Sequence, residues 1–214
     1  SYCNMVIAHT DTTNDMRWRD ARFVPENGVY LGFNYGQQFD GDGNKIKDRN
    51  GNNLVYTFAC PLDGATEASG VRSIKFYPKL LPVEGGRYAN DYPIFRLADA
   101  YLMRAECNLR QGTESGAAPV DDVNAIRAKR NKASDGSMQV AAGDVTLDFI
   151  LAERAIELFN ENKRRQDLIR FGKYLAPKDS KPGASPEYRK LCPIPQPQID
   201  MIDGLTQNPG YATN

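Results

Sequence analysis

The chain has 214 residues, 41% hydrophobic and 25% charged, which is ordinary for a globular protein and excludes wholesale disorder. Basic and acidic residues are equal at 27 each, so the basic surplus of a nucleic-acid-binding protein is absent. No apolar run is long enough to span a bilayer. Because the sequence begins at Ser1 with neither an initiator methionine nor a signal-peptide pattern, we expect a processed or truncated piece of a longer protein.

By composition the sequence divides into three parts. Residues 1–90 are rich in glycine, asparagine, aspartate and aromatic residues, with strand-like runs at 54–58 and 71–77 between turn signals. Residues 91–175 show helical periodicity, and residues 176–214 hold seven of the thirteen prolines. We expect a loop-rich part with short β-hairpins that carries the ligand site, a helical repeat scaffold, and an irregular tail packed on the helices. All three belong to one predicted domain.

Four helices are predicted in the middle part. In the first, apolar residues recur on one face between positions 94 and 109, with Pro93 in the first turn and Gly112 ending the helix in a left-handed conformation. The other three are predicted at 121–130, after Thr146 as N-cap, and at about 164–174. Their short links favour antiparallel neighbours, and hence helix pairs of the solenoid kind.

The stretch 153–170 is dense in both charged and apolar residues. We interpret it as helices that each bury one face and join their polar flanks by arginine–carboxylate pairs. The expected structural charge network is Glu153, Arg154, Glu157, Arg165, Asp167 and Arg170. Glu153 and Glu157 lie one helical turn apart, a spacing that would also suit a glycosidase, but nearby arginines lower a carboxyl pKa and a general acid needs it raised. The sequence therefore favours a structural role over catalysis.

No other pattern indicates an active site. The single histidine, His9, lies in a polar stretch and is expected to be solvated. The sequence has no nucleophile elbow, phosphate-binding loop or dinucleotide fingerprint. Cys107 is expected to be a small buried hydrophobe in the first helix. The cysteines form no metal-ligating pair, and their spacing leaves any disulfide pairing open: Cys3, Cys60, Cys107 and Cys192.

One loop begins like a calcium site, with oxygen-bearing side chains at alternate positions. Lys45 and Gly51 then stand where the EF-hand pattern requires glycine and glutamate, so a solvated turn is favoured and calcium is the alternative. No motif in the sequence requires a cofactor. The residues that would form the metal site are Asp40, Asp42, Asn44 and Asp48.

Aromatic and amide residues are mixed in the first part of the chain. This mixture suits sugar binding, because the C–H face of a sugar ring stacks on an aromatic ring while amides bond its hydroxyls. The alternative is that the aromatic residues form a small core of the loop region. Trp18 is the strongest candidate for ligand contact. The other candidates are Tyr30, Asn34, Tyr35 and Gln37.

Four segments resemble, in order, signatures of the SusD/RagB family. They are YPIFRLADAYLMRAE (92–106), DDVNAIRAKRN (121–131), ILAERAIELFNENKRRQDLIRFG (150–172) and CPIPQPQIDMIDGLTQNPGY (192–211). Their joint order makes the resemblance specific to the C-terminal portion of a family member. Asn162, Phe171 and Cys192 depart from the residues usual in the family, all at scaffold positions.

The resemblance implies a mainly α fold of tetratricopeptide-like helix pairs, an α/α superhelix, with loops that carry the ligand site. It also implies a non-enzymatic, glycan-binding lipoprotein on the outer membrane of Bacteroidetes, which delivers oligosaccharide or polysaccharide to a SusC-like TonB-dependent transporter. The N-terminal lipid anchor is absent from this chain, and Cys3 is not assigned to it. The family's ligand residues follow no motif, so none is transferred. The alternative function is a helical-repeat module that binds a protein and no sugar.

Overall fold

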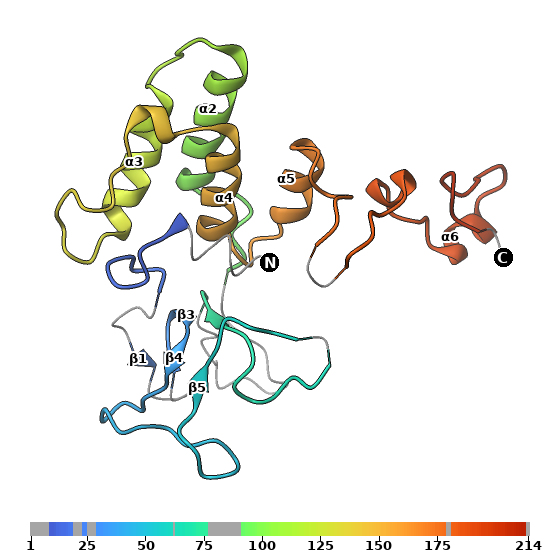
Figure 1. Cartoon of the computed structure of the whole chain (residues 1–214). Helices are drawn as coiled ribbons and strands as arrows, with labels where there is room; N and C mark the ends of the chain where they lie inside the picture. The colour runs from blue at the N-terminus through green and yellow to red at the C-terminus, as the bar shows by residue number, and fades with distance from the viewer. Residues whose placement is uncertain are drawn as a thin grey trace. The chain divides into compact units, whose positions relative to one another are not determined.

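The computed structural model describes residues 9–18, 23–24, 29–61, 63–76, 91–178 and 181–212. They fall into two compact units, Ser1–Arg164 and Arg165–Asn214. In the first unit α2 (Leu97–Gln111) packs against both α3 (Pro119–Arg130) and α4 (Leu147–Glu157), as Figure 1 shows. Within the described residues, no helix combines the length and the apolar character that crossing a membrane requires.

The predicted ends of these helices are confirmed in two cases and wrong in one. Gly112 has φ 65° and its N–H bonds the carbonyl of Asn108 at 2.9 Å, which ends α2 as expected. The Thr146 hydroxyl accepts the N–H of Phe149 at 3.1 Å and so caps α4. Pro93, however, precedes α2, because the backbone is still extended at Arg96.

Buried apolar side chains fill the space between the three helices. Leu102 and Ala105 of α2 face Val123 of α3 and Ile150 of α4, and all four are almost fully buried. The expectation for Cys107 is wrong: it lies on the other side of α2 and is exposed. The cysteines at 60, 107 and 192 are free, whereas Cys3 lies outside the described residues.

The loop-rich part forms three short antiparallel pairs, as predicted for a region of small hairpins. They are β1 (Phe23–Val24) with β2 (Val29–Tyr30), β3 (Gly32–Asn34) with β6 (Arg72–Ile74), and β4 (Gly36–Gln37) with β5 (Val55–Tyr56). The strand-like runs at 54–58 and 71–77 contain β5 and β6, although Tyr77 lies outside the described residues. Trp18 and Phe33 join this part to the helices by packing on Ile156 of α4.

Between β4 and β5 stand two turns of the same design, which we call the tandem turns (residues 39–54). In each, an aspartate carboxylate accepts the backbone N–H of the residue four positions later, Asp40 from Asn44 and Asp48 from Asn52, both at 2.8 Å. Three residues spaced eight apart form a closed ring of backbone hydrogen bonds. The N–H of Gln38 donates to the carbonyl of Leu54, that of Leu54 to the carbonyl of Ile46, and that of Ile46 to the carbonyl of Gln38. The stretches FDGDGNKI and KDRNGNNL are thus an eight-residue repeat that the sequence analysis missed.

The second unit contains α5 (Arg164–Arg170), which starts at the boundary, η3 (Glu187–Lys190) and α6 (Gln196–Met201). The fourth predicted helix is therefore shorter than expected, since it ends at Arg170. The expectation of a tail without helices is wrong at α6, where Pro197 occupies the first turn, a position that needs no N–H donor.

Two segments of the family-like tail signature bind each other. The Gln207 side chain accepts the N–H of Ile194 and donates to its carbonyl, both at 2.8 Å. Gly210 has φ 88°, and a Cβ there would lie 2.5 Å from the Tyr188 ring. Only glycine fits at this position, which explains why the QNPGY run contains it.

Candidate functional site

A buried charge network surrounds one face of α4. Glu153 and Glu157, one turn apart, are both buried. Arg17 donates from Nη1 to Glu153 at 2.6 Å and to Glu157 at 3.4 Å, and from Nη2 to Asp15 at 2.7 Å. One arginine from the loop part thus ties together three carboxylates that carry no exposed charge.

Two further arginines come from α3, three residues apart and so on one face of that helix. Arg127 Nη1 donates to Glu153 at 2.8 Å. Arg130 holds Glu157 with two bonds, from Nη2 at 2.7 Å and Nε at 3.0 Å. Arg96, just before α2, reaches Glu157 at 3.1 Å. Three other chain segments, the loop that carries Arg17, helix α3 and the segment before α2, therefore contact α4 through charge-assisted hydrogen bonds.

The predicted membership of this network needs correction. Arg154 belongs to the first unit but pairs with Asp99 of α2 at 2.8 Å. The remaining predicted members lie in the second unit, where Asp167 accepts from Arg170 at 3.0 Å and Arg165 donates to the carbonyl of Lys190 at 2.8 Å. The arginines that neutralise Glu153 and Glu157 are thus not those close to them in sequence.

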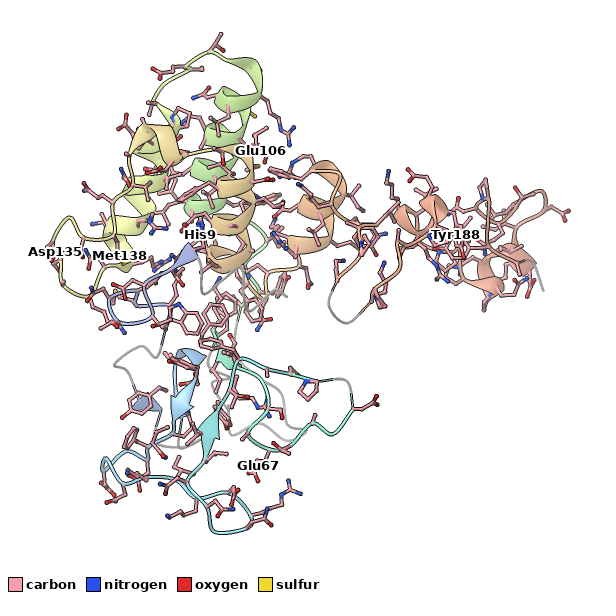
Figure 2. All side chains as sticks on the ribbon, in the orientation of Figure 1. His9, Glu67, Glu106, Asp135, Met138 and Tyr188 are labelled. Carbon is pink, nitrogen blue, oxygen red and sulfur yellow. The ribbon has the colours of Figure 1, made fainter. Side chains whose placement is uncertain are left out.

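His9 is not solvated, contrary to expectation. Its Nε2 lies 2.9 Å from Glu153 Oε2, and its ring centroid lies 4.2 Å from that of Phe149. Figure 2 shows the labelled His9 side chain beside α4. The residue therefore belongs to the charge network, because the chain before Trp18 runs back to the helices.

Glu153 and Glu157 are ionised, which opposes a role as a catalytic acid. Burial alone would raise the pKa of the Glu153 carboxyl, but the charges of Arg17 and Arg127 and the bond with His9 lower it. For Glu157 the same burial is outweighed by the hydrogen bond from Arg130 and by neighbouring arginine charges, so its pKa is also lowered. A glycosidase acid needs the opposite shift, and neither carboxyl can hold a proton near neutral pH.

Trp18 is a core residue, which corrects its assignment as the leading ligand contact. It is 2% exposed, and its indole N–H donates to Thr10 Oγ1 at 2.7 Å. Its ring packs on Phe33 and Phe58, with centroids 5.3 and 5.9 Å away. A ring covered in this way offers no face for a sugar to stack on.

Of the other predicted ligand contacts, only Tyr35 combines an aromatic ring with substantial exposure. Asn34 is buried and donates to the carbonyl of Tyr30 at 2.7 Å, while Gln37 donates to that of Gln38 at 2.7 Å. Tyr30 is half-buried. Tyr35 is 38% exposed and stacks on Phe58 at a centroid distance of 4.2 Å.

The residues predicted for calcium are divided between the tandem turns. Asp40 and Asp48 each accept bonds from the backbone of their own turn, and these bonds help to lower both pKa values. Among the described residues, no three acidic, histidine or cysteine side chains gather where they could hold a metal ion. Calcium binding stays a prediction, and the Asp40 and Asp48 carboxylates that it would use already accept backbone N–H groups.

A cavity of about 260 Å³ opens beside the charge network in the first unit. Its lining includes the aromatic residues Phe33, Phe76 and Phe159 and the charged residues Arg96 and Arg130. It thus joins aromatic rings and hydrogen-bond donors in a single concave place, as ligand sites do. This combination is not visible in the sequence, because the lining residues come from six separate segments.

The comparison with known families decides the identity of this fold. The model of the SusD family matches residues 6–211. The chain belongs to the SusD family. This membership confirms the resemblance seen in the four sequence signatures, which all lie within the matched range.

Among its relatives, the Starch-binding protein SusD of Bacteroides thetaiotaomicron is 36% identical over 139 residues, covering 61% of this chain and 23% of that protein. A SusD superfamily protein from Bacteroides vulgatus has a TM-score of 0.54 at 23% identity, covering 78% of this chain and 36% of that one. NanU of Bacteroides fragilis has a TM-score of 0.50 at 23% identity, covering 79% and 34%. These structures confirm the mainly α fold with small hairpins, and the chain spans only about a quarter to a third of its relatives.

Some members of the site could have been found from the sequence. Arg127 and Arg130 stand three apart in a predicted helix, and Arg96 lies in a family-like segment, so their convergence on a carboxylate pair was open to prediction. Arg17 carries no such signal, because it lies in a loop 136 residues from Glu153. Its role became visible only in the folded chain.

Proposed function

We propose that the protein carrying this chain binds oligosaccharides without cleaving them and delivers them to a SusC-like TonB-dependent transporter on the outer-membrane surface, held there by an N-terminal lipid anchor. Membership of the SusD family over residues 6–211 carries the proposal. The name of the curated relative, a starch-binding protein, supports a sugar as ligand and names no reaction.

The charge network supports binding without catalysis. Glu153 and Glu157 are one turn apart, but each is matched by arginines and ionised. Their ionised state stabilises the contacts among four chain segments and leaves no proton to donate to a glycosidic oxygen. Incubation with oligosaccharides should therefore return them intact, and release of shortened products would contradict the proposal.

Within this proposal Tyr35 is a surface contact for the sugar. It lies on a stacked pair with Phe58, so its ring is held rigidly while part of it faces outward. A fixed aromatic ring loses little conformational freedom when a ligand stacks on it. We expect Tyr35→Ala to weaken binding of a maltooligosaccharide by about tenfold, from the roughly 1–3 kcal/mol of a lost stacking contact.

Isothermal titration of the 214-residue chain with maltoheptaose tests this contact, and a glycan array extends it to other sugars. The matched control is Tyr92→Ala, which removes an exposed aromatic ring away from the Tyr35–Phe58 pair. Equal loss in both variants would show that Tyr35 is not specific to the site. Failure of all glycans to bind would contradict the proposed function.

A second candidate function is a protein-binding module, and one observation favours it. The segment leading into α2 exposes a run of large apolar side chains, with Phe95 76% exposed. The other members of the run are Tyr92, Ile94 and Leu97. Co-purification of the chain with the transporter, together with no response on a glycan array, would favour this function over sugar binding.

A further inference from the structure

The cavity beside α4 is strongly asymmetric in charge. Within the described residues, its lining contains one carboxylate, that of Glu157. Its cationic members are Arg17, Lys75, Arg96, Lys129 and Arg130. A neutral sugar needs no such collection of positive side chains, because its hydroxyls are bonded equally well by amides and carboxylates.

The carboxylates that neutralise these cations are more deeply buried than the cations. The side chains of Asp15, Glu153, Glu157 and Glu161 are at most 2% exposed, whereas those of their cationic partners Arg17, Lys75, Arg96 and Arg130 are 9%, 23%, 23% and 35% exposed. A group that enters the cavity therefore meets more positive than negative side chains, because only Glu157 among these four carboxylates reaches the lining. Because the walls are protein rather than water, that field is screened less than on an open surface.

Two donors at the cavity are not used by the network. Lys129 has no hydrogen-bond or ion-pair partner among the described residues, and it is exposed. Arg130 spends Nε and Nη2 on Glu157, which leaves Nη1 without a bond to any described residue. Both residues lie in the last turn of α3, and both line the cavity.

The lining also offers one exposed aromatic ring. Phe76 is 40% exposed, whereas Phe33 is a buried core residue and Phe159 is partly buried. The Lys75 ammonium lies 5.7 Å from the centroid of the Phe76 ring. A sugar ring that stacks on Phe76 would therefore lie next to the cations of the lining.

We infer that this cavity selects glycans that carry an acidic group, a carboxylate or a sulfate, with Lys129 and Arg130 Nη1 as the anion contacts and the exposed Phe76 ring as the ring contact. The inference rests on the proposed function and narrows its ligand to acidic sugars.

Three tetrasaccharides test the inference by isothermal titration against the 214-residue chain: an oligogalacturonate, its methyl ester, and a sulfated galactan. The ester keeps the sugar ring and removes only the charge. We expect the oligogalacturonate or the sulfated galactan to bind about tenfold more tightly than the ester at low salt. Whichever acid binds more tightly identifies the group as carboxylate or sulfate, and about 0.5 M salt should remove most of the preference.

Two lysine variants assign the preference to the cavity. Lys129→Ala should weaken binding of the acidic tetrasaccharide about fivefold and leave the ester unchanged. Lys45→Ala is the matched control, because it removes an exposed lysine from the tandem turns, outside the cavity. Equal affinity for acid and ester would overturn the inference while leaving glycan binding intact, as would a preference that Lys129→Ala does not alter. If none of the three binds, the inference fails, whereas the proposed function fails only if the glycan array also gives no response.

Discussion

Carboxylates stabilise two regions of this chain by different means. On α4, Glu153 and Glu157 are buried and bound by arginines from three other segments. In the tandem turns, Asp40 and Asp48 are bound by the backbone N–H groups of their own turns. The pKa values of all four carboxyls are lowered, yet one pair joins distant parts of the fold and the other shapes a few residues.

This difference shows that a lowered pKa says little about a carboxylate's role until its donors are known. A donor two to four residues away fixes a local turn and could form in a short peptide. A donor 136 residues away, such as Arg17 for Glu153, exists only after the chain has folded. The four predictions below test this distinction, from the largest expected effect to the smallest.

Glu153→Gln should cause the largest loss of stability. The substitution keeps the shape of the side chain but leaves Arg17 and Arg127 buried beside an uncharged group. Removing one partner of a buried ion pair costs about 3–5 kcal/mol of unfolding free energy. Urea unfolding measures this loss. The control is Glu67→Gln, which changes an exposed glutamate whose ion-pair partner within the described part of the chain is Arg49. Similar small losses in both variants would show that the network does not hold the fold together.

Acid should unfold the chain through the same carboxylates. Because Glu153 and Glu157 have pKa values below the ordinary 4.5, their contribution is full above pH 4.5 and is lost as the pH falls toward the folded values. Each such carboxyl then contributes a slope of about 1.4 kcal/mol per pH unit. Thermal unfolding between pH 7 and 3 measures this loss.

The acid sensitivity should belong to the network rather than to the turns. Glu153→Gln should reduce the slope of stability against pH, whereas the double change Asp40→Asn and Asp48→Asn should leave most of it. A larger reduction of this slope in the double aspartate variant than in Glu153→Gln would show that the turns, and not the network, cause the acid sensitivity.

Asp48→Ala should loosen one turn and little else. Its carboxylate holds the backbone N–H groups of Asn50 and Asn52 at 2.9 and 2.8 Å. Without them, hydrogen exchange of these two amides should accelerate by about tenfold, the scale of one hydrogen bond. The amides of Asp42 and Asn44, which the Asp40 carboxylate holds in the matching turn, serve as the internal control. Faster exchange throughout α2–α4 would show that the turn is not independent.

Arg49→Ala should have the smallest effect. Arg49 meets Glu67 at 3.2 Å on the surface, where solvent screens the pair and both side chains lose freedom by forming it. We expect no measurable change in the midpoint of urea unfolding. A shift as large as that of Glu153→Gln would mean that surface pairs matter here as much as buried ones.

Local chemistry made the helices predictable. The left-handed ending at Gly112 and the cap at Thr146 involve residues within four positions of each other, so a linear reading contains the whole interaction. The family signatures were legible for the same reason, since each is a continuous segment. The missed six-residue helix at Gln196–Met201 is too short for its periodicity to stand out among prolines.

The functional site was predictable only in its residue types. The sequence by itself determined that Glu153 and Glu157 share a helix face, that arginines neutralise them, and that the fold is that of a SusD family member. Tertiary structure decided which arginines do so, buried Trp18, paired His9 with Glu153, and placed Lys129 in the lining of a cavity. The physical reason is that burial and long-range charge pairing depend on which distant segments meet in the folded chain. The spacing of residues along the sequence does not specify those meetings.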